Sequence, residues 1–269
     1  MMISYCRQAV LMSAVAVAFW AVALPGLASA QVRVTTSGGF AAAFQDVLPE
    51  FERATGIRVI TASGASQGTG PDTIGNQLRR GVPMDVVILS REGLDELVAE
   101  GRIIAESDVD LAVTLIGLAV RAGAPRPNIS DIASFRHTLV SAKAVAIPTS
   151  TGGRHVTDSV LPRLGISGQV VVRLTERGAA AVALVAGGEA ELAIQPVSEL
   201  IHAKGVDFVS AIPAELQFES VYSAAIIRGA ADVTQSRRLV AFLASSQATP
   251  AVENNGMRRA RPRRPVAGR

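Results

Sequence analysis

The chain has almost none of the residues that form disulfides, thiolate active sites or histidine-rich metal centres. Its 269 residues include one cysteine, Cys6, and three histidines that are far apart in the sequence. A disulfide needs two cysteines, and a metal site needs several His, Cys, Asp or Glu ligands at close spacing. We therefore expect no disulfide, no cysteine nucleophile, no metal site and no cofactor.

The chain lacks an excess of basic residues outside its two ends. Residues 258–269 include six arginines and no acid, and Arg7 adds one positive charge near the N-terminus. The remainder has 19 Lys and Arg against 23 Asp and Glu, so its net charge is −4 although the whole chain carries +3. With only 4% aromatic residues, not interleaved with basic ones, we expect no nucleic-acid binding. We expect 258–269 to be a basic disordered tail.

The longest apolar run, 9-AVLMSAVAVAFWAVAL-24, lies close to the N-terminus. It follows Arg7 and precedes 26-GLASA-30, which ends in a small-x-small pattern. This order is typical of a cleavable signal peptide and not of a spanning helix. We expect cleavage after Ala30, export to the periplasm, and no membrane span in the mature protein. The absence of cysteine after residue 30 is compatible with that compartment.

Beyond the leader, short apolar runs alternate with amphipathic patterns. The expected strands are 32–36, 57–63, 86–90, 144–148, 170–176 and 190–196. The pattern at 40–56 predicts a helix whose buried face comprises Phe40, Phe44, Val47, Leu48 and Phe51. Residues 154–165 repeat this spacing, and both segments end in a glycine. The alternation predicts the α/β class, with mostly parallel sheets covered by helices on both faces.

Two longer apolar segments, 111–123 and 221–229, interrupt the alternation. Each is predicted to be a strand that no helix follows, and about 100 residues with their own strands and helices lie between them. A chain that leaves one lobe, builds a second and returns needs two such crossings. We therefore expect two lobes with a ligand cleft between them. Lobe one would be 31–112 plus 221–257, and lobe two 113–220.

Four loops that follow expected strands combine small residues with hydroxyl groups. They are 36-TSGGF-40, 63-SGASQGTG-70, Ser90 with Arg91, and 148-PTSTGGRH-155. In open α/β sheets, ligands bind beyond the carboxyl ends of the strands, where N–H groups at helix starts are free. The loops therefore favour an anion site built from hydrogen-bond donors. Taken singly, each would also serve as an ordinary turn with a helix cap.

The order of these features resembles the molybdate-binding proteins of ABC importers, which have the type II periplasmic binding-protein fold. The resemblance covers nearly all of residues 32–257. It is carried by 44-FQDVLPEFERATGIRV-59, 81-GVPMDVVILS-90, 94-LDELVAEGRI-103, 181-AVALVAGGEAELAI-194 and 253-ENNGM-257. It implies an α/β protein of two lobes that holds a small anion in the cleft between them.

The resemblance also implies where the anion is held. In that family, serines after the first two strands, backbone amides of the second lobe and a tyrosine after a later strand bind the oxyanion. The corresponding positions here are Ser37 or Gly39, Ser66, Thr151, Gly178, and Pro196 beside Gln195. The tyrosine is therefore missing at its expected position, and the first serine is uncertain.

Three arginines, Arg91, Arg154 and Arg177, lie where the family uses neutral contacts. Guanidinium groups bind carboxylates with two parallel hydrogen bonds, so the arginines favour an organic carboxylate over molybdate. Each would alternatively be a solvated surface cation. The predicted ligand-binding residues are Ser37, Gly38, Gly39, Ser66, Gln67, Ser90, Arg91, Ser150, Thr151, Gly152, Arg154, Arg177, Gly178 and Gln195.

Two functions fit these observations. The first is a monomeric periplasmic binding protein that captures a molybdate-like oxyanion or an organic carboxylate and delivers it to an ABC permease. The second follows from aconitate isomerase, which resembles the same family and interconverts cis- and trans-aconitate. That reaction needs a group that moves a proton along an allylic system. Histidine side chains transfer protons near neutral pH, so His155 is the catalytic candidate.

Overall fold

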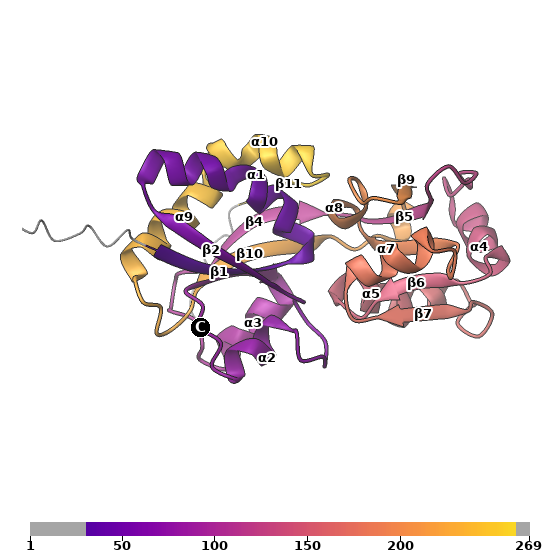
Figure 1. The fold of residues 1–269 in the computed structure, drawn as a ribbon. Coiled ribbons are helices and arrows are strands. Elements are labelled where there is room, and N and C mark those ends of the chain that lie inside the picture. The colour runs from indigo at the N-terminus through magenta and orange to yellow at the C-terminus, as the bar shows by residue number, and fades with distance from the viewer. Residues whose placement is uncertain (1–30, 262–269) are drawn as a thin grey trace, which may run out of the picture.

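The computed structural model of the protein describes residues 31–261, which form two β-sheets flanked by helices (Figure 1). The first sheet has six strands in the order β11-β4-β10-β3-β1-β2, and the second has five in the order β7-β6-β8-β5-β9. The expected leader, its cleavage site and residues 262–269 lie outside the described residues. The α/β prediction is confirmed.

The strands follow the apolar runs of the sequence closely, and 86–90 matches without any shift. Their bounds are β1 Gln31–Ser37, β2 Arg58–Gly64, β3 Val86–Ser90, β4 Val109–Thr114, β5 Ile116–Arg121, β6 Val145–Pro148, β7 Val172–Thr175, β8 Leu192–Pro196, β9 Val206–Ala211, β10 Ser220–Ile226 and β11 Arg258–Arg259.

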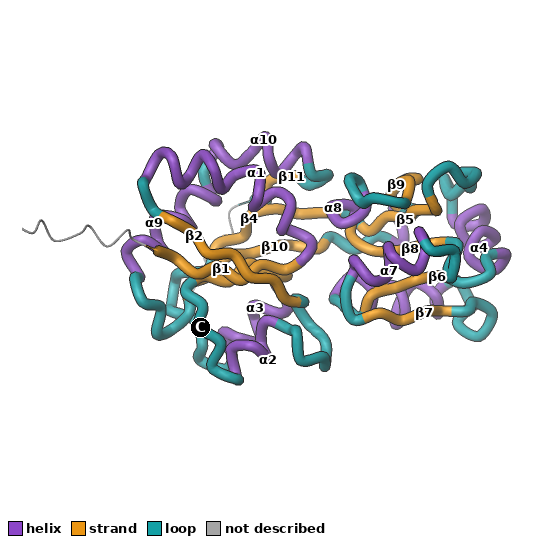
Figure 2. Tube along the Cα trace, viewed as in Figure 1, coloured by secondary structure: helices purple, strands orange, loops and turns teal. Residues whose placement is uncertain are grey.

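The helices connect these strands and cover the sheets (Figure 2). Their bounds are α1 Gly38–Thr55, α2 Ile74–Arg79, α3 Arg91–Ala99, α4 Ile132–Ser141, α5 Thr151–His155, α6 Leu161–Arg163, α7 Gly178–Ala186, α8 Val197–Leu200, α9 Val233–Ala244 and α10 Thr249–Asn254. A π-helical turn, Val156–Val160, joins α5 to α6, so the helix expected at 154–165 is one helical segment that begins earlier. Short 3₁₀ turns lie at Ala214–Leu216 and Ser246–Ala248.

The strands of the β-α-β units run parallel, and the strands near the crossings run antiparallel. Strand β1 pairs in parallel with β2 and β3, and β6 with β7 and β8. In contrast, β10 runs antiparallel to β3 and β4, and β5 to β8 and β9. Both sheets are therefore mixed, and as expected most strands of each run in one direction: β1, β2, β3 and β4 in the first sheet, and β6, β7, β8 and β9 in the second. Strands β10 and β5 run the other way because each enters its sheet from the other lobe.

The apolar segment 111–123 contains two strands that belong to different sheets. Its first part lies in β4 of the first sheet and its second part in β5 of the second, with Leu115 between them. The returning segment forms β10, which lies between β4 and β3. The two sheets are therefore joined by short connections, which lets the strand ends of both face one cavity.

Each sheet has an apolar core on both of its faces. Helices α1, α9 and α10 cover one face of the first sheet, and α2 and α3 cover the other (Figure 1). In α1, Phe40, Phe44, Val47 and Phe51 are buried as the spacing predicts. Burial of such side chains stabilises the fold by roughly 1.5–3 kcal/mol each. Gly56 ends α1 in the left-handed conformation, with φ of 70°.

The first two residues of the expected disordered tail form a strand. Arg258 and Arg259 form β11, which pairs with Val113 and Ala112 of β4. The Arg258 guanidinium also lies 2.7 Å from the Glu219 carboxylate. Composition alone predicted disorder here, but free backbone groups at the edge of β4 accept the two residues into the sheet.

Candidate functional site

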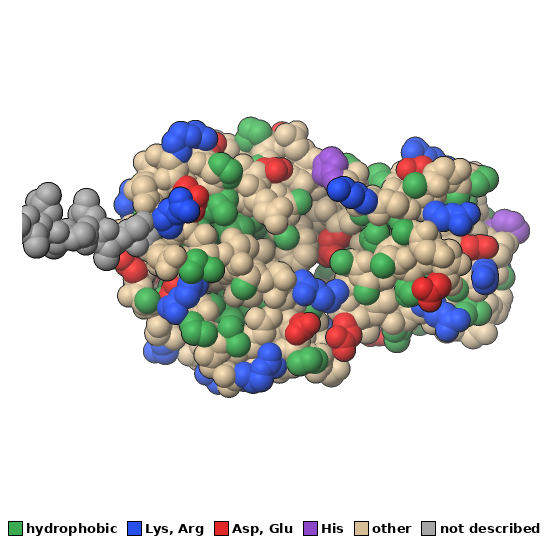
Figure 3. Space-filling view, in the orientation of Figure 1, with side chains coloured by type: hydrophobic (Ala, Val, Ile, Leu, Met, Phe, Trp, Pro, Cys, Tyr) green, Lys and Arg blue, Asp and Glu red, His purple; other side chains and the backbone are tan. Residues whose placement is uncertain are grey.

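A cavity of about 450 Å³ lies between the two sheets, at the carboxyl ends of several strands. The space-filling view shows charged side chains of both signs gathered where the lobes meet (Figure 3). Residues of both lobes line the cavity: Ser37, Gly38, Gly39, Ala41, Ala42, Gln45, Gly64, Ala65, Ser66, Ser90, Ser150, Thr151, Gly152, Glu176, Arg177, Gly178, Ala179, Val182, Ser198, Glu199, His202, Ala203, Lys204 and Tyr222.

Three serine hydroxyl groups in the cavity wall have no hydrogen-bond partner among the described residues. They belong to Ser37, Ser150 and Ser198, and each oxygen is shielded from solvent. Ser37 and Ser150 precede α1 and α5 in the N-cap position, yet neither side chain caps its helix. A buried polar group without a partner costs free energy, and these hydroxyls are therefore free to form hydrogen bonds with a molecule in the cavity.

The first turns of α1 and α7 face the same cavity. Gly38 and Gly39 open α1, and Gly178 opens α7. The first N–H groups of a helix have no partner within it and carry the positive end of the helix dipole. Helix starts from both lobes, together with the Arg177 guanidinium, therefore make the cavity suitable for an anion.

A carboxylate, that of Glu199, also lies in the cavity, on α8 directly after β8. A Cβ atom built on Gly38 would be 3.0 Å from Glu199 Oε2, and one on Gly178 would overlap it. The carboxylate thus lies against the starts of both helices, one from each lobe. Burial raises the pKa of Glu199 to about 7, although the Arg177 charge acts in the opposite direction. Near neutral pH, Glu199 is therefore present in both protonation states.

Tyr222 of β10 contributes a phenol hydroxyl beside the start of α1. The residue is 4% exposed, and a Cβ atom on Gly39 would overlap its hydroxyl, so glycine is required there. Burial, with the nearby Glu199 charge adding to it, raises the pKa of Tyr222 well above its usual range. Tyr222 therefore stays protonated, so its hydroxyl is able to donate a hydrogen bond.

Side chains of the two lobes bond to each other along one side of the cavity. The Ser90 and Thr151 hydroxyls are 3.0 Å apart, and the Thr151 hydroxyl donates to Gln67 Oε1. The same Gln67 oxygen accepts from Arg154 Nη2. Arg177 Nη2 donates to the Ser63 hydroxyl at 3.1 Å. These contacts bridge the lobes, so the structure has a closed cleft.

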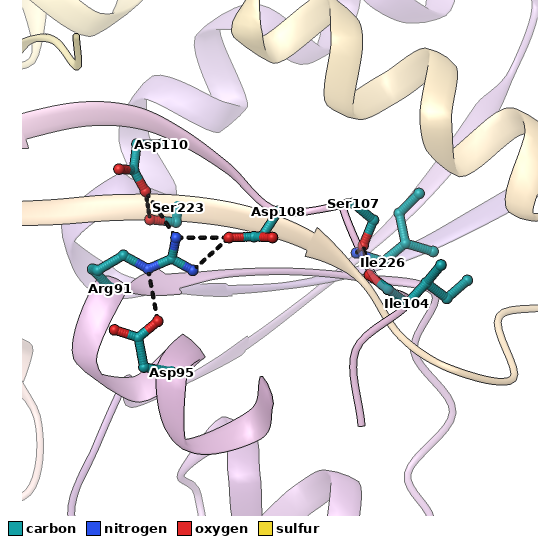
Figure 4. Close-up of polar contacts among 8 residues, drawn as sticks. All are labelled: Arg91, Asp95, Ile104, Ser107, Asp108, Asp110, Ser223 and Ile226. Carbon is teal, nitrogen blue, oxygen red and sulfur yellow. Dashed lines mark hydrogen bonds and ion pairs between the residues drawn. The ribbon is translucent and has the colours of Figure 1, made fainter. Parts of the chain in front are cut away.

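Arg91 does not line the cavity, and three aspartates engage its side chain (Figure 4). Nη1 lies 2.8 Å from Asp108 Oδ2 and 3.2 Å from Asp110 Oδ1, and Nε lies 3.2 Å from Asp95 Oδ1. The Ser223 hydroxyl donates to the same Asp110 oxygen at 2.6 Å. Nearby, the Ser107 hydroxyl donates to Ile104 O and accepts from Ile226 N–H. Arg91 therefore ties α3 to β4 and β10, and this arrangement gives its predicted ligand role no support.

His155 also lies away from the cavity. Its Nε2 is 2.9 Å from the Leu216 carbonyl oxygen, and its ring stacks on Phe218 with centroids 5.1 Å apart. The predicted catalytic role has no support in this geometry, because the ring is held by residues that lie outside the cavity wall.

Most of the predicted ligand-binding residues lie in the cavity wall, and they share positions at strand ends or helix starts: Ser37, Gly38, Gly39, Ser66, Ser90, Ser150, Thr151, Gly152, Arg177 and Gly178. Gln67 and Arg154 lie in the bridge between the lobes. Gln195 is fully buried beside Gly178, with its Oε1 unpartnered. Ser198, Glu199 and Tyr222 were missed. Glu199 had one available signal, because 196-PVSE-199 follows a strand at the same sheet edge as the predicted loops.

Two kinds of feature are absent from residues 31–261, namely groups of metal ligands and helices that could span a membrane. No group of three His, Cys, Asp or Glu side chains in this range is arranged to hold a metal ion. No helix in the range is both long and apolar enough to cross a bilayer.

Comparisons with known proteins agree with this geometry. The family model of bacterial extracellular solute-binding proteins matches residues 32–258. The chain is similar to aconitate isomerase of a Pseudomonas species, with 37% identity over 226 residues that cover 84% of this chain and 86% of that protein. It is also 27% identical over 234 residues to the molybdate-binding protein ModA of Azotobacter vinelandii, covering 85% and 90% of the two chains.

A solved structure supports the fold independently. The periplasmic molybdate-binding protein of Azotobacter vinelandii matches with a TM-score of 0.67 at 18% identity, over 84% of this chain and 98% of that one. At this identity the likeness concerns the fold alone. The predicted resemblance and the two-lobe type II fold are confirmed.

Proposed function

The chain belongs to the bacterial extracellular solute-binding protein family, and from this premise we propose that its cleft binds a small organic polycarboxylate of the aconitate type. The proposal rests on which groups line the cavity. The wall combines unpartnered hydroxyls of both lobes, two helix starts and Arg177 with a carboxylate, Glu199. The donors attract an anion, and Glu199 repels any anion whose whole surface is negative.

The size of the cavity agrees with a ligand larger than a tetrahedral oxyanion. Its volume of about 450 Å³ falls within the range of about 300–1,000 Å³ that is usual for pockets that bind organic molecules. A polycarboxylate has several separated charged groups with C–H groups between them. It is therefore able to turn its carboxylates towards Ser37, Ser150 and Arg177 and an uncharged carbon towards Glu199.

Capture of this ligand would follow from closure of the lobes. We propose that residues 31–112 with 221–257, and residues 113–220, move as two units about the connections near Leu115 and before β10. Contacts such as Ser90–Thr151 and Arg177–Ser63 form only when the lobes meet. A ligand that touches both lobes favours the closed state because its contacts are lost on opening. In this function the protein is a periplasmic monomer that delivers its ligand to an ABC permease.

A second candidate function is isomerisation of the bound ligand. It is favoured by Glu199, which lies inside an anion cavity with a pKa of about 7, and by the 37% identity with aconitate isomerase. A protein that only captures an anion does not need a group that exchanges a proton with it. An isomerase needs such a group to accept and return a proton.

Thermal unfolding of the purified protein with cis-aconitate, trans-aconitate, citrate, molybdate and sulfate tests the proposed ligand class. A ligand at a hundred times its Kd adds about 2.7 kcal/mol to the free energy of unfolding, which raises Tm visibly. We expect a rise with the polycarboxylates. A rise with molybdate or sulfate alone would contradict the proposal. Proton NMR of cis-aconitate incubated with the protein then separates capture from isomerisation.

A further inference from the structure

We propose that Glu199 is the catalytic residue of a double-bond migration in this cleft, moving a proton between two carbon atoms of the bound polycarboxylate. This rests on the proposed polycarboxylate site and assigns the proton-transfer step to one side chain.

The position of Glu199 is fixed by elements of both lobes. The residue follows Pro196, the last residue of β8, and its Oε2 lies against Gly38 of α1 and Gly178 of α7. Any side chain at residue 178 would displace the carboxylate, so the glycine keeps this space open. In the described part of the chain, no hydrogen bond or ion pair engages the Glu199 carboxylate. Its oxygens therefore remain available to a ligand.

The electrostatic surroundings suit a group that takes up and releases protons. Burial raises the pKa of Glu199 to about 7, and Arg177 limits the rise. The carboxylate form accepts a proton from carbon, and the acid form returns it. Arg177 stabilises the carboxylate form, and the helix starts at Gly38 and Gly178 favour negative charge on either the residue or the ligand.

Other titratable groups in or near the cavity are less suited to this step. His155 lies outside the wall and is held by Leu216 and Phe218. Tyr222 stays protonated because its pKa is raised well above the usual range. His202, Lys204 and Glu176 are exposed at the rim, where solvent exchanges any proton that they carry.

The proposed step balances without a co-reactant. The Glu199 carboxylate removes a proton from the CH₂ group of cis-aconitate, the C–H electron pair forms a new C=C bond to the central carbon, and the original π electron pair moves to the far carbon. The resulting allylic carbanion is delocalised over three carbons and the attached carboxylate, which the hydroxyls of Ser37 and Ser150 and the Arg177 guanidinium stabilise. Protonated Glu199 then delivers the proton to the far allylic carbon. The double bond moves by one position, no atom is gained or lost, and Glu199 ends as a carboxylate.

The test compares wild type with Glu199→Gln, which keeps the shape of the side chain and removes its basicity. Glu189→Gln, on the surface in the turn that follows α7, is the matched control. Each protein is incubated with cis-aconitate in D₂O, and proton NMR follows the isomer ratio and deuterium incorporation at carbon. Calorimetry measures the affinity of each protein for the same ligand.

We expect Glu199→Gln to lose at least about 10²-fold of the isomerisation rate, the lower end of the usual contribution of general acid–base catalysis. Its affinity for cis-aconitate should be unchanged or higher, because a negative charge has been removed. The control should match wild type in both measurements. Isomerisation at the wild-type rate by Glu199→Gln would overturn the assignment.

Two further outcomes separate failure of this assignment from failure of the proposed function. Wild type that binds cis-aconitate but neither isomerises it nor exchanges its carbon-bound hydrogen overturns the catalytic role and leaves the polycarboxylate site standing. Wild type that does not bind any polycarboxylate overturns both. Far-UV circular dichroism identifies a variant that does not fold, and Glu199→Asp, which retains a shortened base, then serves in its place with a partial rate as the expected result.

Discussion

Replacement of Ser37 by alanine tests whether the Ser37 hydroxyl binds the ligand or stabilises the fold. The Ser37 hydroxyl is buried, lacks a partner in the described chain, and lines the cavity. Since it forms no capping bond to α1, its removal costs the fold no hydrogen bond. The matched control is Ser220→Ala, because the Ser220 hydroxyl is equally buried and unpartnered but does not line the cavity.

The expected size of the effect follows from the charge of the ligand. A hydrogen bond to a charged group contributes about 1.5–3 kcal/mol, which corresponds to a roughly 10–150-fold change in Kd. Ser37→Ala should therefore weaken binding of cis-aconitate by that factor in calorimetry. Neither substitution should lower the free energy of unfolding, since each removes a hydroxyl with no protein partner. Equal affinity of Ser37→Ala and wild type, or an equal loss in Ser220→Ala, would refute the role of the Ser37 hydroxyl.

Three other predictions test the surroundings of the site. Arg91→Leu should lower the free energy of unfolding by about 1–3 kcal/mol in urea titrations, because it removes the cation that faces the partly buried Asp110 carboxylate, while folded protein keeps its affinity for cis-aconitate. Burial raises the pKa of Glu199 from 4.5 to about 7, so the folded state favours the protonated side chain. The contribution of this side chain to the free energy of unfolding is therefore fully present below pH about 4.5 and is lost as pH rises through about 7. Glu199→Gln should therefore be more stable than wild type by about 3 kcal/mol at pH 8 and equal to it at pH 4. Gly178→Ala should abolish isomerisation, as its Cβ would displace the Glu199 carboxylate, and a wild-type rate would show that this packing is not needed.

Much of the fold is predictable because its signals are local. The apolar face of α1 and the run at 86–90 depend on neighbours within a few residues, and both agree with the structure. The break at Leu115 is not local, because both halves of 111–123 are equally apolar and only their pairing partners assign them to different sheets. Likewise, Arg258 and Arg259 form β11 because β4 offers a free edge, which their composition does not reveal.

The site is predictable only in part, for a related reason. Loops such as 36-TSGGF-40 were found because the carboxyl ends of strands and the starts of helices meet at one edge of a sheet. Arg91 was predicted to bind the ligand, but it pairs with Asp108 and Asp110. The sequence around Arg91 does not reveal these partners, because they come from a segment more than 15 residues away. Glu199 was missed because its place in the site depends on its contacts with Gly38 and Gly178. These residues come from different lobes, so the sequence does not show that they lie together.

The placement of Glu199 also predicts different affinities for a tetrahedral oxyanion and for a polycarboxylate. Two unit negative charges 4 Å apart repel by about 4 kcal/mol at an effective dielectric constant of 20, which corresponds to roughly a thousandfold in Kd. A tetrahedral dianion presents a charged oxygen in every orientation, so it meets this repulsion unless Glu199 first takes up a proton. A polycarboxylate avoids it by presenting a C–H group. In that orientation the carbon atom nearest to Glu199 is also the one that loses a proton in the proposed isomerisation, so the arrangement that would favour binding is the one that the proposed reaction would require.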